Sequence, residues 1–479
     1  MKGEAVNERR QRPNVRRQTS NVIWWAVAGL LAVLIVVDYV QLWPRVNNKD
    51  LRVIVEAGQA LARGGDIFAD IEPFRARLES GSFDLKDPDV RWPYAYPPFA
   101  AILILPLATL PFEPVALAWT VANVIMLAAG GYLCLKAQGP VEPLDLALLG
   151  AILYAFYPAI VTVRLGQIEI LQFLLLAGAF LALKRGRDGL AGGLLGVATA
   201  LKLFPGVLIA FLFWKRLWRP AVIALVTALA LLVGSFAAVG LDQVPRYLAF
   251  TSVYGRGPFG AFPLNQSLHG FFARNLTANL FVAPLKGWDL PWLADGLTLG
   301  LSAGLIAIWA WLTWGPAPVG KSINHKDHQE HKETDHGSRI THHASRIASH
   351  VSRSAARFDL EFGGNIALLL LVLPHSQVYA FVWLLVPLLV LAYQLRRSRP
   401  NWSWLAAAVA YALVGRQYQL FRPGLTRLVS SHVMFGALLL LFVVAALLWQ
   451  AKRPTPYAMC NMHDGSRIAP RGNTGGQAL

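Results

Sequence analysis

Asp50 stands at the head of an amphipathic stretch, residues 50–63, just after the first long apolar run of the chain. Leu51, Ile54 and Val55 recur at helical spacing with charged residues opposite them, which predicts a helix in the membrane interface. An aspartate at a helix start is a common N-cap. A carboxylate at a membrane boundary can also act as a general base toward a substrate hydroxyl. Both interpretations fit the sequence.

Lys202 is a charged residue inside an apolar segment, "GVATALKLFPGVL". An ionisable group at membrane depth is a functional candidate, and the alternative is that its ammonium group snorkels to the outer surface. Gln167 and Arg164 form a similar polar break between apolar runs in "TVRLGQIEIL".

Three further stretches combine polar and aromatic residues. In "RWPYAYPPF" (91–99), Tyr96 and its neighbours suit either an interfacial aromatic belt or the apolar face of a sugar. In "LPHSQVY" (373–379), His375 suits a proton relay or a phosphate contact, and the alternative is a buried, hydrogen-bonded histidine. The stretch "FPLNQSLHGFFARNL" (262–276) is either a ligand surface or a solvated loop helix, and its polar residues are Asn265, Gln266, Ser267, His269 and Arg274.

Together these stretches supply one acid near the membrane, several cations, amides and aromatic rings. This set fits chemistry on a lipid-linked phosphate. The cations would hold the phosphate, the amides and aromatics would hold a sugar, and the carboxylate would take a proton from the acceptor hydroxyl.

Apolar helices must position these residues. The chain has 479 residues, 55% of them hydrophobic and 15% charged, whereas soluble domains carry about a quarter charged residues. About ten apolar runs approach the roughly 20 residues that a bilayer crossing requires. The sequence therefore predicts an all-α polytopic membrane protein with about 10–12 transmembrane helices.

The basic residues flank the apolar runs, so we interpret the formal net charge of +17 as membrane topology and expect no nucleic-acid partner. Residues 1–20 are strongly basic, which predicts a cytoplasmic N-terminus in the cell membrane and an extracytoplasmic first loop that carries Asp50.

Two basic clusters, "KRGRDG" (184–189) and "KRLWR" (215–219), bracket a predicted hairpin of two short helices that turns near Lys202 and Pro205. Counting spans from residue 96 puts "KRGRDG" on the wrong side of the membrane. We therefore expect that one segment in this region does not cross fully, and the proline-broken run 96–112 is a candidate.

We divide the rest of the chain into a transmembrane catalytic core (21–315), an insertion (316–362), C-terminal transmembrane helices (363–451) and a tail (452–479). The insertion holds seven of the eleven histidines and a recurring Ser-Arg pair. His-rich tracts sometimes bind metals. The polar, repetitive composition instead favours a disordered cytoplasmic segment, and we expect the tail to be disordered too.

The order of these motifs resembles the GT-C superfamily of integral-membrane glycosyltransferases, and most closely the bacterial polyprenol-phosphate-mannose-dependent α-mannosyltransferases. The matching pieces are "KDLRVIVEAGQALARGGDIF", "YAYPPFAAILILPLATLP", "RLGQIEILQFLLLAGAFLALKRGRDGLAGGLLGVATALKLFPGVL" and "NQSLHGFFARNL". They cover most of residues 20–280.

The resemblance implies a GT-C fold with interfacial helices in the first loop. It also implies an inverting transfer of a hexose, mannose in the family, from a polyprenyl-phosphate donor to a glycolipid or glycan acceptor. The lipid bilayer is then a further partner of the protein. Asp50 would be the catalytic base, and Lys202 and Arg274 would face the donor phosphate. We expect no metal and no other cofactor, because the cations take the charge-stabilising role.

The remaining candidates divide between the two substrates. We expect Gln167, Asn265, Tyr96 and His269 to contact the donor phosphate or sugar, and His375 and Tyr379 to serve the acceptor side or a proton relay. The sequence departs from the family at Gln377, where a tryptophan is usual, and at Tyr379-Ala380, where paired histidines are usual. A lipid-linked saccharide flippase or polymerase, or a transporter, is the alternative function, since broken helices with charged residues also occur there.

Overall fold

The computed structural model describes residues 4–42, 46–80, 92–154, 156–256, 258–279, 281, 287–316, 337–397, 401–417 and 429–452. Within these ranges the secondary structure is helical, and the only β pairing is an isolated bridge between Asn265 and Gln377. The predicted all-α polytopic class is confirmed.

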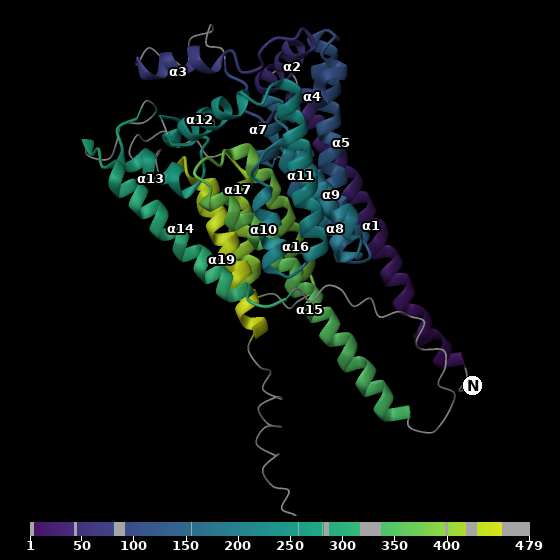
Figure 1. Cartoon of the computed structure of the whole chain (residues 1–479). Coiled ribbons are helices and arrows are strands. Elements are labelled where there is room, and N and C mark those ends of the chain that lie inside the picture. The colour runs from purple at the N-terminus through teal and green to yellow at the C-terminus, as the bar shows by residue number, and fades with distance from the viewer. Residues whose placement is uncertain are drawn as a thin grey trace, which may run out of the picture.

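The helices form a bundle with a layer of short helices across one end (Figure 1). In chain order they are α1 (Glu4–Leu42), α2 (Lys49–Ala62), α3 (Ile71–Glu79), α4 (Pro98–Ile104), α5 (Phe112–Gln138), α6 (Pro143–Leu153), α7 (Tyr157–Leu165), α8 (Glu169–Lys184), α9 (Asp188–Leu201), α10 (Gly206–Trp214), α11 (Trp218–Val239), α12 (Gln243–Arg256), α13 (Leu268–Leu276), α14 (Pro291–Thr313), α15 (Gly337–Val372), the 3-10 helix η6 (Val378–Leu384), α16 (Leu385–Leu395), α17 (Trp402–Gly415) and α19 (His432–Lys452).

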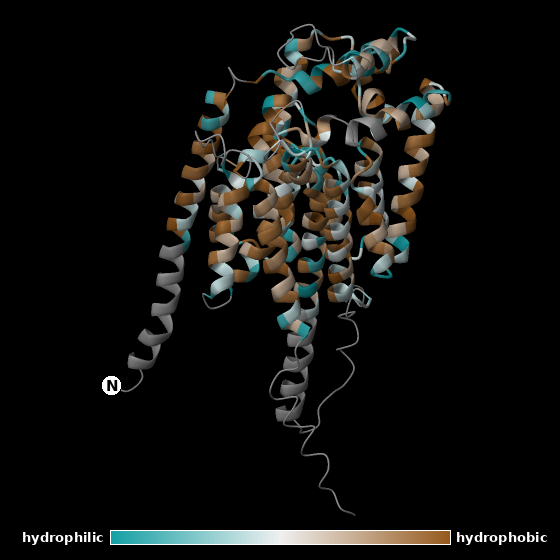
Figure 2. Ribbon diagram, turned by 90° about the vertical axis from the view of Figure 1, so that its left-hand side faces the viewer, coloured by the Kyte–Doolittle hydropathy of each residue, from teal (hydrophilic) through white to brown (hydrophobic). Residues whose placement is uncertain are grey.

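The bundle presents an apolar belt to the bilayer. Figure 2 shows hydrophobic residues along the middle of the helices, with hydrophilic residues gathered at both ends. On α11, Val226, Leu229 and Val233 are 60%, 51% and 60% exposed and lie on one helical face. Such exposure of large apolar side chains is stable only against lipid or a partner surface.

Six described helices are long and apolar enough to cross a membrane, or seven when α6 and α7, bent by 62°, count as one span. We expected about 10–12 crossings. The difference arises because several apolar runs are broken: α8 has 16 residues, and the run around Lys202 is divided between α9 and α10. These shorter helices lie beside the long ones, because α8 packs between α5 and α9.

The proline-broken segment 96–112 begins and ends at the same end of the bundle. Tyr96 hydrogen-bonds Gln167, and the guanidinium of Arg52, on α2, lies 3.9 Å from the ring centroid of Phe112. The apolar helix Pro98–Leu107 is moreover shorter than a crossing requires. These contacts favour the interpretation that segment 96–112 does not cross, which would place the loop at residues 184–189 on the side of the other basic clusters.

The basic clusters meet α15 at one level. Lys184 Nζ lies 2.5 Å from Asp359 Oδ1, Lys215 Nζ lies 2.9 Å from Glu361 Oε2, and Gln394, beside Arg396, donates to the backbone oxygen of Ala356. From this level α15 rises to Val372, about 20 Å away at 1.5 Å per residue. These basic clusters therefore lie together at the end of the bundle remote from α2 (Figure 1).

The insertion ends earlier in the chain than we predicted. Residues 317–336 lie outside the described residues, but α15 begins at Gly337 and continues to Val372. Phe358 and Phe362 are buried, and Phe362 stacks on Phe180 with ring centroids 4.9 Å apart. The expectation of disorder up to residue 362 was wrong, because a short apolar and charged sequence there packs into the bundle core.

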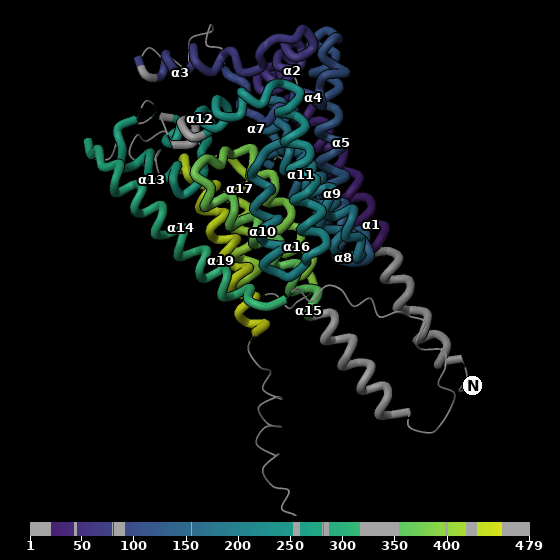
Figure 3. The backbone as a smooth tube through the Cα atoms, viewed as in Figure 1, coloured from purple at the N-terminus to yellow at the C-terminus, as the bar shows by residue number. Residues whose placement is uncertain are grey.

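The predicted hairpin around Lys202 is confirmed. Figure 3 shows α9, α10 and α11 side by side in the bundle. Gly192 and Gly196 of α9 face α11, where added Cβ atoms would lie 2.7 Å from the backbone oxygen of Pro220 and 2.5 Å from Thr227. Small residues let the two helices approach closely. This packing fixes the position of the C-terminal end of α9, which carries Lys202, relative to α11.

Candidate active site

A glycine turn brings α7 against the start of α2. Gly166 has φ +73°, and the amides of Gly166 and Gln167 donate to Val163 O and Thr162 O, which is a Schellman end for α7. The amides of Asn47 and Asn48 both donate to Arg164 O, at 3.0 and 3.1 Å. A Cβ at position 166 would lie 2.7 Å from atoms of Asn48 and Leu51. The glycine thus permits the contact between the turn and α2.

Asp50 is not the N-cap of α2. The helix begins at Lys49, the capping position is Asn48 with φ 46°, and Asp50 lies in the first turn. The carboxylate instead points to the Gly166 turn, where Asp50 Oδ2 accepts a hydrogen bond of 2.6 Å from Gln167 Nε2. The capping interpretation was wrong. The Asp50 side chain is instead held by Gln167, in the turn between α7 and α8.

Tyr96, Gln167 and Asp50 form a hydrogen-bond chain. The Tyr96 hydroxyl donates to Gln167 Oε1 at 2.6 Å. With Oε1 engaged in this way, the NH₂ group of the Gln167 amide points to Asp50. Within the described residues, Asp50 Oδ1 has no protein hydrogen-bond partner. Burial, together with the charge of Glu169, raises the pKa of Asp50 above its ordinary value, while Gln167 and Lys202 oppose the shift. A raised pKa makes the carboxylate a stronger base.

Lys202 does not snorkel to the surface. It follows α9 in an extended conformation, and its Nζ lies 2.5 Å from Oε1 of Glu169, the first residue of α8. The Glu169 side chain is 0% exposed and the Lys202 side chain 18% exposed. The rings of Tyr96 and Tyr379 have their centroids 5.3 and 5.1 Å from the ammonium nitrogen, within the range of a cation–π contact.

Buried hydrogen bonds hold this ion pair in place. Gln172 Nε2 donates to Ala198 O at 2.9 Å, which ties α8 to the end of α9. Trp383 Nε1 donates to Glu169 O at 3.1 Å, and Thr162 Oγ1 lies 3.3 Å from Tyr379 O. The α7, α8 and η6 backbones are therefore linked around the pair, which leaves Lys202 little freedom except toward the cavity.

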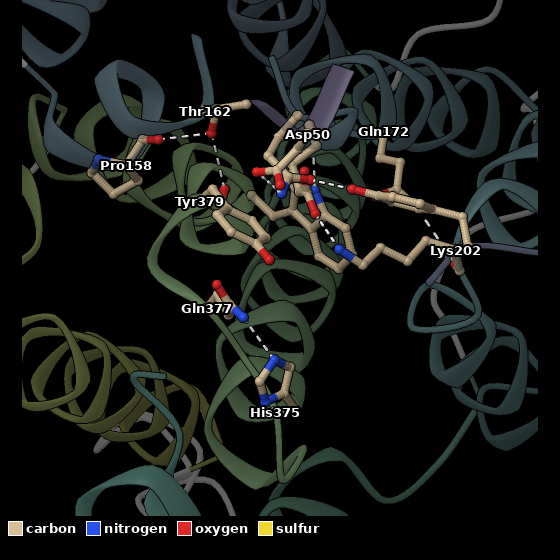
Figure 4. Close-up of polar contacts among 12 residues, drawn as sticks. Asp50, Pro158, Thr162, Gln172, Lys202, His375, Gln377 and Tyr379 are labelled. Carbon is tan, nitrogen blue, oxygen red and sulfur yellow. Dashed lines mark hydrogen bonds and ion pairs between the residues drawn. The ribbon is translucent and has the colours of Figure 1, made fainter. Parts of the chain in front are cut away.

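Asp50, Gln167 and Lys202 line one cavity of about 220 Å³. Figure 4 shows Asp50, Lys202 and Tyr379 close together, with Gln377 and His375 extending away from them. Of the residues that we predicted for the site, the cavity brings together Asp50, Tyr96, Gln167, Lys202, His375 and Tyr379. The rest of its wall is mainly apolar and aromatic, and includes Val53, Trp92, Leu203, Phe204, Tyr247 and Phe250.

His375 lines the same cavity and pairs with Gln377, with their Nε2 atoms 2.7 Å apart. Burial lowers the pKa of His375 below its ordinary value, and the positive charges of Lys202 and His269 lower it further. The imidazole is therefore neutral at physiological pH, where it offers a hydrogen bond rather than a charge.

Asn265, His269 and Arg274 do not line this cavity. Asn265 Nδ2 donates to Gly260 O and Pro374 O, and its Oδ1 accepts from the amides of Ser267 and Ser376. The stretch 262–276 is neither a ligand surface nor a solvated helix around these residues. It clamps the loop that carries His375.

Arg274 belongs to the same clamp. Its guanidinium is 0% exposed and donates to Phe262 O at 2.9 Å, Asn265 O at 2.5 Å and Ser431 Oγ at 2.8 Å. Both terminal nitrogens therefore have protein partners, and Arg274 does not line the cavity that contains Asp50 and Lys202. His269, which is 8% exposed, has Nδ1 3.8 Å from Asp295 Oδ1.

Sequence reasoning missed Glu169. The available signal was its position two residues after Gln167, at the start of an apolar run where an uncompensated carboxylate is costly. The metal hypothesis for the histidine cluster at 325–336 falls outside the described residues. Within the described part of the chain, no group of three or more histidine, cysteine or acidic side chains is placed to hold a metal ion.

Two mannosyltransferases are similar to this chain over about 270 residues. Both are named polyprenol-phosphate-mannose-dependent alpha-(1-2)-phosphatidylinositol pentamannoside mannosyltransferase. The protein of Mycobacterium tuberculosis (strain CDC 1551 / Oshkosh) is 29% identical over 55% of this chain and 57% of its own length. The protein of Mycolicibacterium smegmatis (strain ATCC 700084 / mc(2)155) is 28% identical over 56% of this chain and 59% of its own length.

The chain thus spans less than two thirds of the length of these relatives. Residues 94–323 match the model of Glycosyltransferase family 87, and this range contains Tyr96, Gln167, Glu169 and Lys202 but not Asp50. Over residues 94–323, about 48% of its length, the chain is therefore similar to glycosyltransferase family 87.

Proposed function

We propose that this protein is an inverting glycosyltransferase that moves a hexose, mannose in the first instance, from a polyprenyl-phosphate-linked donor to a hydroxyl of a glycolipid or glycan acceptor. The single observation that carries the proposal is the cavity in which Asp50, held by Gln167 and Tyr96, lies beside the Lys202–Glu169 pair. The family match and the names of the two relatives support the donor class.

Asp50 would act as the general base. Its Oδ2 is fixed by Gln167, which leaves Oδ1 to accept the proton of the acceptor hydroxyl. The acceptor oxygen then forms a bond to C1 of the donor sugar while the bond between C1 and the phosphate oxygen breaks. The proton stays on Asp50 until solvent removes it, and polyprenyl phosphate leaves with the electron pair of the broken bond.

Lys202 would stabilise the departing phosphate. Negative charge grows on the phosphate oxygens as the C1–O bond breaks, and a fixed ammonium group beside them lowers the energy of that state. In the described structure the ammonium group pairs with Glu169. Lys202 lines the cavity, and a phosphate there would be a second partner for its ammonium group.

The lipid chain of the donor would leave the cavity between the α9–α10 turn and α12. Leu203, Phe204 and Phe250 line the cavity on that side, and Leu203 and Val207 are 41% and 42% exposed on the apolar surface. A polyprenyl chain that enters from the bilayer would keep its apolar surface out of water.

The site would face the extracytoplasmic side of the cell membrane, with the N-terminus in the cytoplasm. The basic clusters at 184–189, 215–219 and 395–397 lie at the end of the bundle remote from Asp50, and cytoplasmic loops are the ones enriched in lysine and arginine.

A transfer assay tests this function. Purified full-length protein would be given radiolabelled polyprenyl-phosphate-mannose and a panel of glycolipid and glycan acceptors, and we expect a mannosylated product with inverted anomeric configuration. The Asp50→Asn variant should bind the donor and yield almost no product. A flippase or transporter would move lipid or solute in liposomes without forming a product, and that result would end the proposal.

A further inference from the structure

A second cavity of about 220 Å³ adjoins the first. It is lined by the exposed side of α2, by the turn that follows α2, and by the segment before α4. Val53 and Trp92 belong to the walls of both cavities. The two cavities therefore share a wall that includes the side chains of Val53 and Trp92.

The walls of the two cavities differ in chemistry. The second cavity is lined by many polar side chains, namely Glu56, Gln59, Arg63, Asp66 and Asp70, together with the rings of Trp92 and Tyr94. Asp66 is occupied, because it pairs with Arg246 and accepts from the amide of Phe68. Within the described residues, the side chains of Glu56, Gln59, Arg63 and Asp70 have no protein partner.

We propose that the second cavity binds the sugar of the acceptor, an inference that rests on the proposed function. A sugar presents several hydroxyl groups that both donate and accept hydrogen bonds, and its ring has apolar faces. Two carboxylates, an amide and a guanidinium offer both kinds of partner. Trp92 offers a flat apolar surface beside them.

The position of the cavity relative to Asp50 supports this assignment. Asp50, Val53 and Ala57 follow one another along one side of α2 at helical spacing. Val53, in the shared wall, is thus one helical turn from Asp50, a rise of about 5 Å. A hydroxyl of a sugar held beside Val53 would reach Asp50 from one side, while a donor phosphate at Lys202 would approach from the other.

A metal site explains this cavity less well. Three of its residues carry carboxylates, but no group of three acidic, histidine or cysteine side chains in the described part of the chain is close enough to hold one ion. The guanidinium of Arg63 in the same wall would also repel a cation.

The test uses the full-length protein and mannobiose, a probe that carries no lipid chain. Saturation-transfer difference NMR measures mannobiose binding, and transfer kinetics with polyprenyl-phosphate-mannose are measured on the same preparations. The double variant Glu56→Gln, Gln59→Ala should weaken mannobiose binding at least tenfold and raise its apparent KM by a similar factor. The KM for the donor should stay within twofold, because the first cavity is unchanged.

Glu113→Gln is the matched control, because Glu113 is an exposed carboxylate in the first turn of α5 that lines neither cavity. It should bind mannobiose as the wild type does. Binding that the double variant retains, or that both variants lose equally, would overturn the acceptor site, as would the absence of mannobiose binding to the wild type.

The two proposals fail separately. A wild-type protein that binds mannobiose through Glu56 and Gln59 but never transfers mannose would refute the glycosyltransferase and leave a sugar site. Transfer with an unchanged acceptor KM in the double variant would refute only the site. Repeating the kinetics with octyl mannobioside shows whether the sugar comes from a glycolipid, which predicts a lower KM than mannobiose, or from a free glycan.

Discussion

Gln167 Nε2 donates a hydrogen bond of 2.6 Å to Asp50 Oδ2, although 117 residues separate the two in sequence. The bond crosses from the turn after α7 to the first turn of α2, and Tyr96 fixes its direction by donating to the Gln167 carbonyl oxygen at 2.6 Å. Asp50 is therefore oriented by groups that play no part in capping its own helix. This hydrogen bond is compatible with Asp50 as a general base and is not a helix-capping contact.

The first prediction concerns Asp50→Asn. The rate of transfer should fall by about 10²–10⁴-fold, because an amide cannot take up the proton of the acceptor hydroxyl. The midpoint of thermal unfolding should change little, since Asn48 occupies the capping position and the amide oxygen of the new side chain can accept the same hydrogen bond from Gln167 Nε2.

The control is Asp242→Asn, which makes the same change at an exposed aspartate in the turn before α12. Activity and unfolding temperature should both match the wild type. Normal transfer by the Asp50→Asn protein would refute Asp50 as the base.

The sequence predicted the positions of several site residues but not their partners. The apolar surroundings of Lys202 marked it as a functional candidate, but the sequence did not exclude a lysine that snorkels to the surface. The partner of Asp50 was not predictable, because nothing in residues 47–70 refers to a turn 117 residues later. Glu169 escaped notice because an acidic residue at a helix start is favourable for ordinary reasons.

Arg274 shows the opposite error. A long cation in a polar loop suits phosphate binding, and sequence alone does not reveal whether backbone carbonyls already surround it. In the structure Phe262 O and Asn265 O accept its hydrogen bonds, so that tertiary packing decides its role. The end of the insertion was misplaced for a similar reason, since Phe358 and Phe362 gain their significance only from the aromatic rings they meet.

The second prediction separates two roles of Lys202. Lys202→Met should lower stability by about 3–5 kcal/mol, because it leaves the fully buried Glu169 carboxylate without its partner. The double variant Lys202→Met, Glu169→Gln removes both charges and should recover most of that loss. Both proteins should have a donor KM raised about ten- to hundredfold, since a charge-assisted contact contributes roughly 1.5–3 kcal/mol.

The matched control neutralises the buried pair at the other end of the bundle, with Lys184→Met and Asp359→Asn. Its donor KM should be normal. A stable Lys202→Met, Glu169→Gln protein with a normal donor KM would mean that Lys202 serves only to neutralise Glu169.

The third prediction is a shift in the pH profile. The base must be unprotonated, so activity falls as the pH drops through the pKa of Asp50. The negative charge of Glu169 raises that pKa and the positive charge of Lys202 lowers it. Glu169→Gln removes the first effect and leaves the second, so the acid limb of kcat/KM should move to lower pH. Glu113→Gln, remote from the cavity lining, should leave the limb in place, and a shift to higher pH in Glu169→Gln would contradict the arrangement.

The last prediction tests whether the turn at Gly166 sets the geometry of the base. Gly166 and Gly186 both have left-handed φ angles, +73° and +65°, so an alanine at either position carries a similar backbone cost of roughly 1–2 kcal/mol. They differ in surroundings, because a Cβ at 166 would lie 2.7 Å from Asn48 Oδ1 and Leu51 Cβ, while a Cβ at 186 meets nothing within 4 Å.

Gly186→Ala should therefore lower the unfolding temperature slightly and keep full activity. Gly166→Ala should push α2 away from Gln167 and lower kcat at least tenfold. The donor KM should be less affected, because Lys202 is held by contacts with α8 and α9 and not by the Gly166 turn. Equal kcat values in the two variants would show that Asp50 keeps its position without this turn.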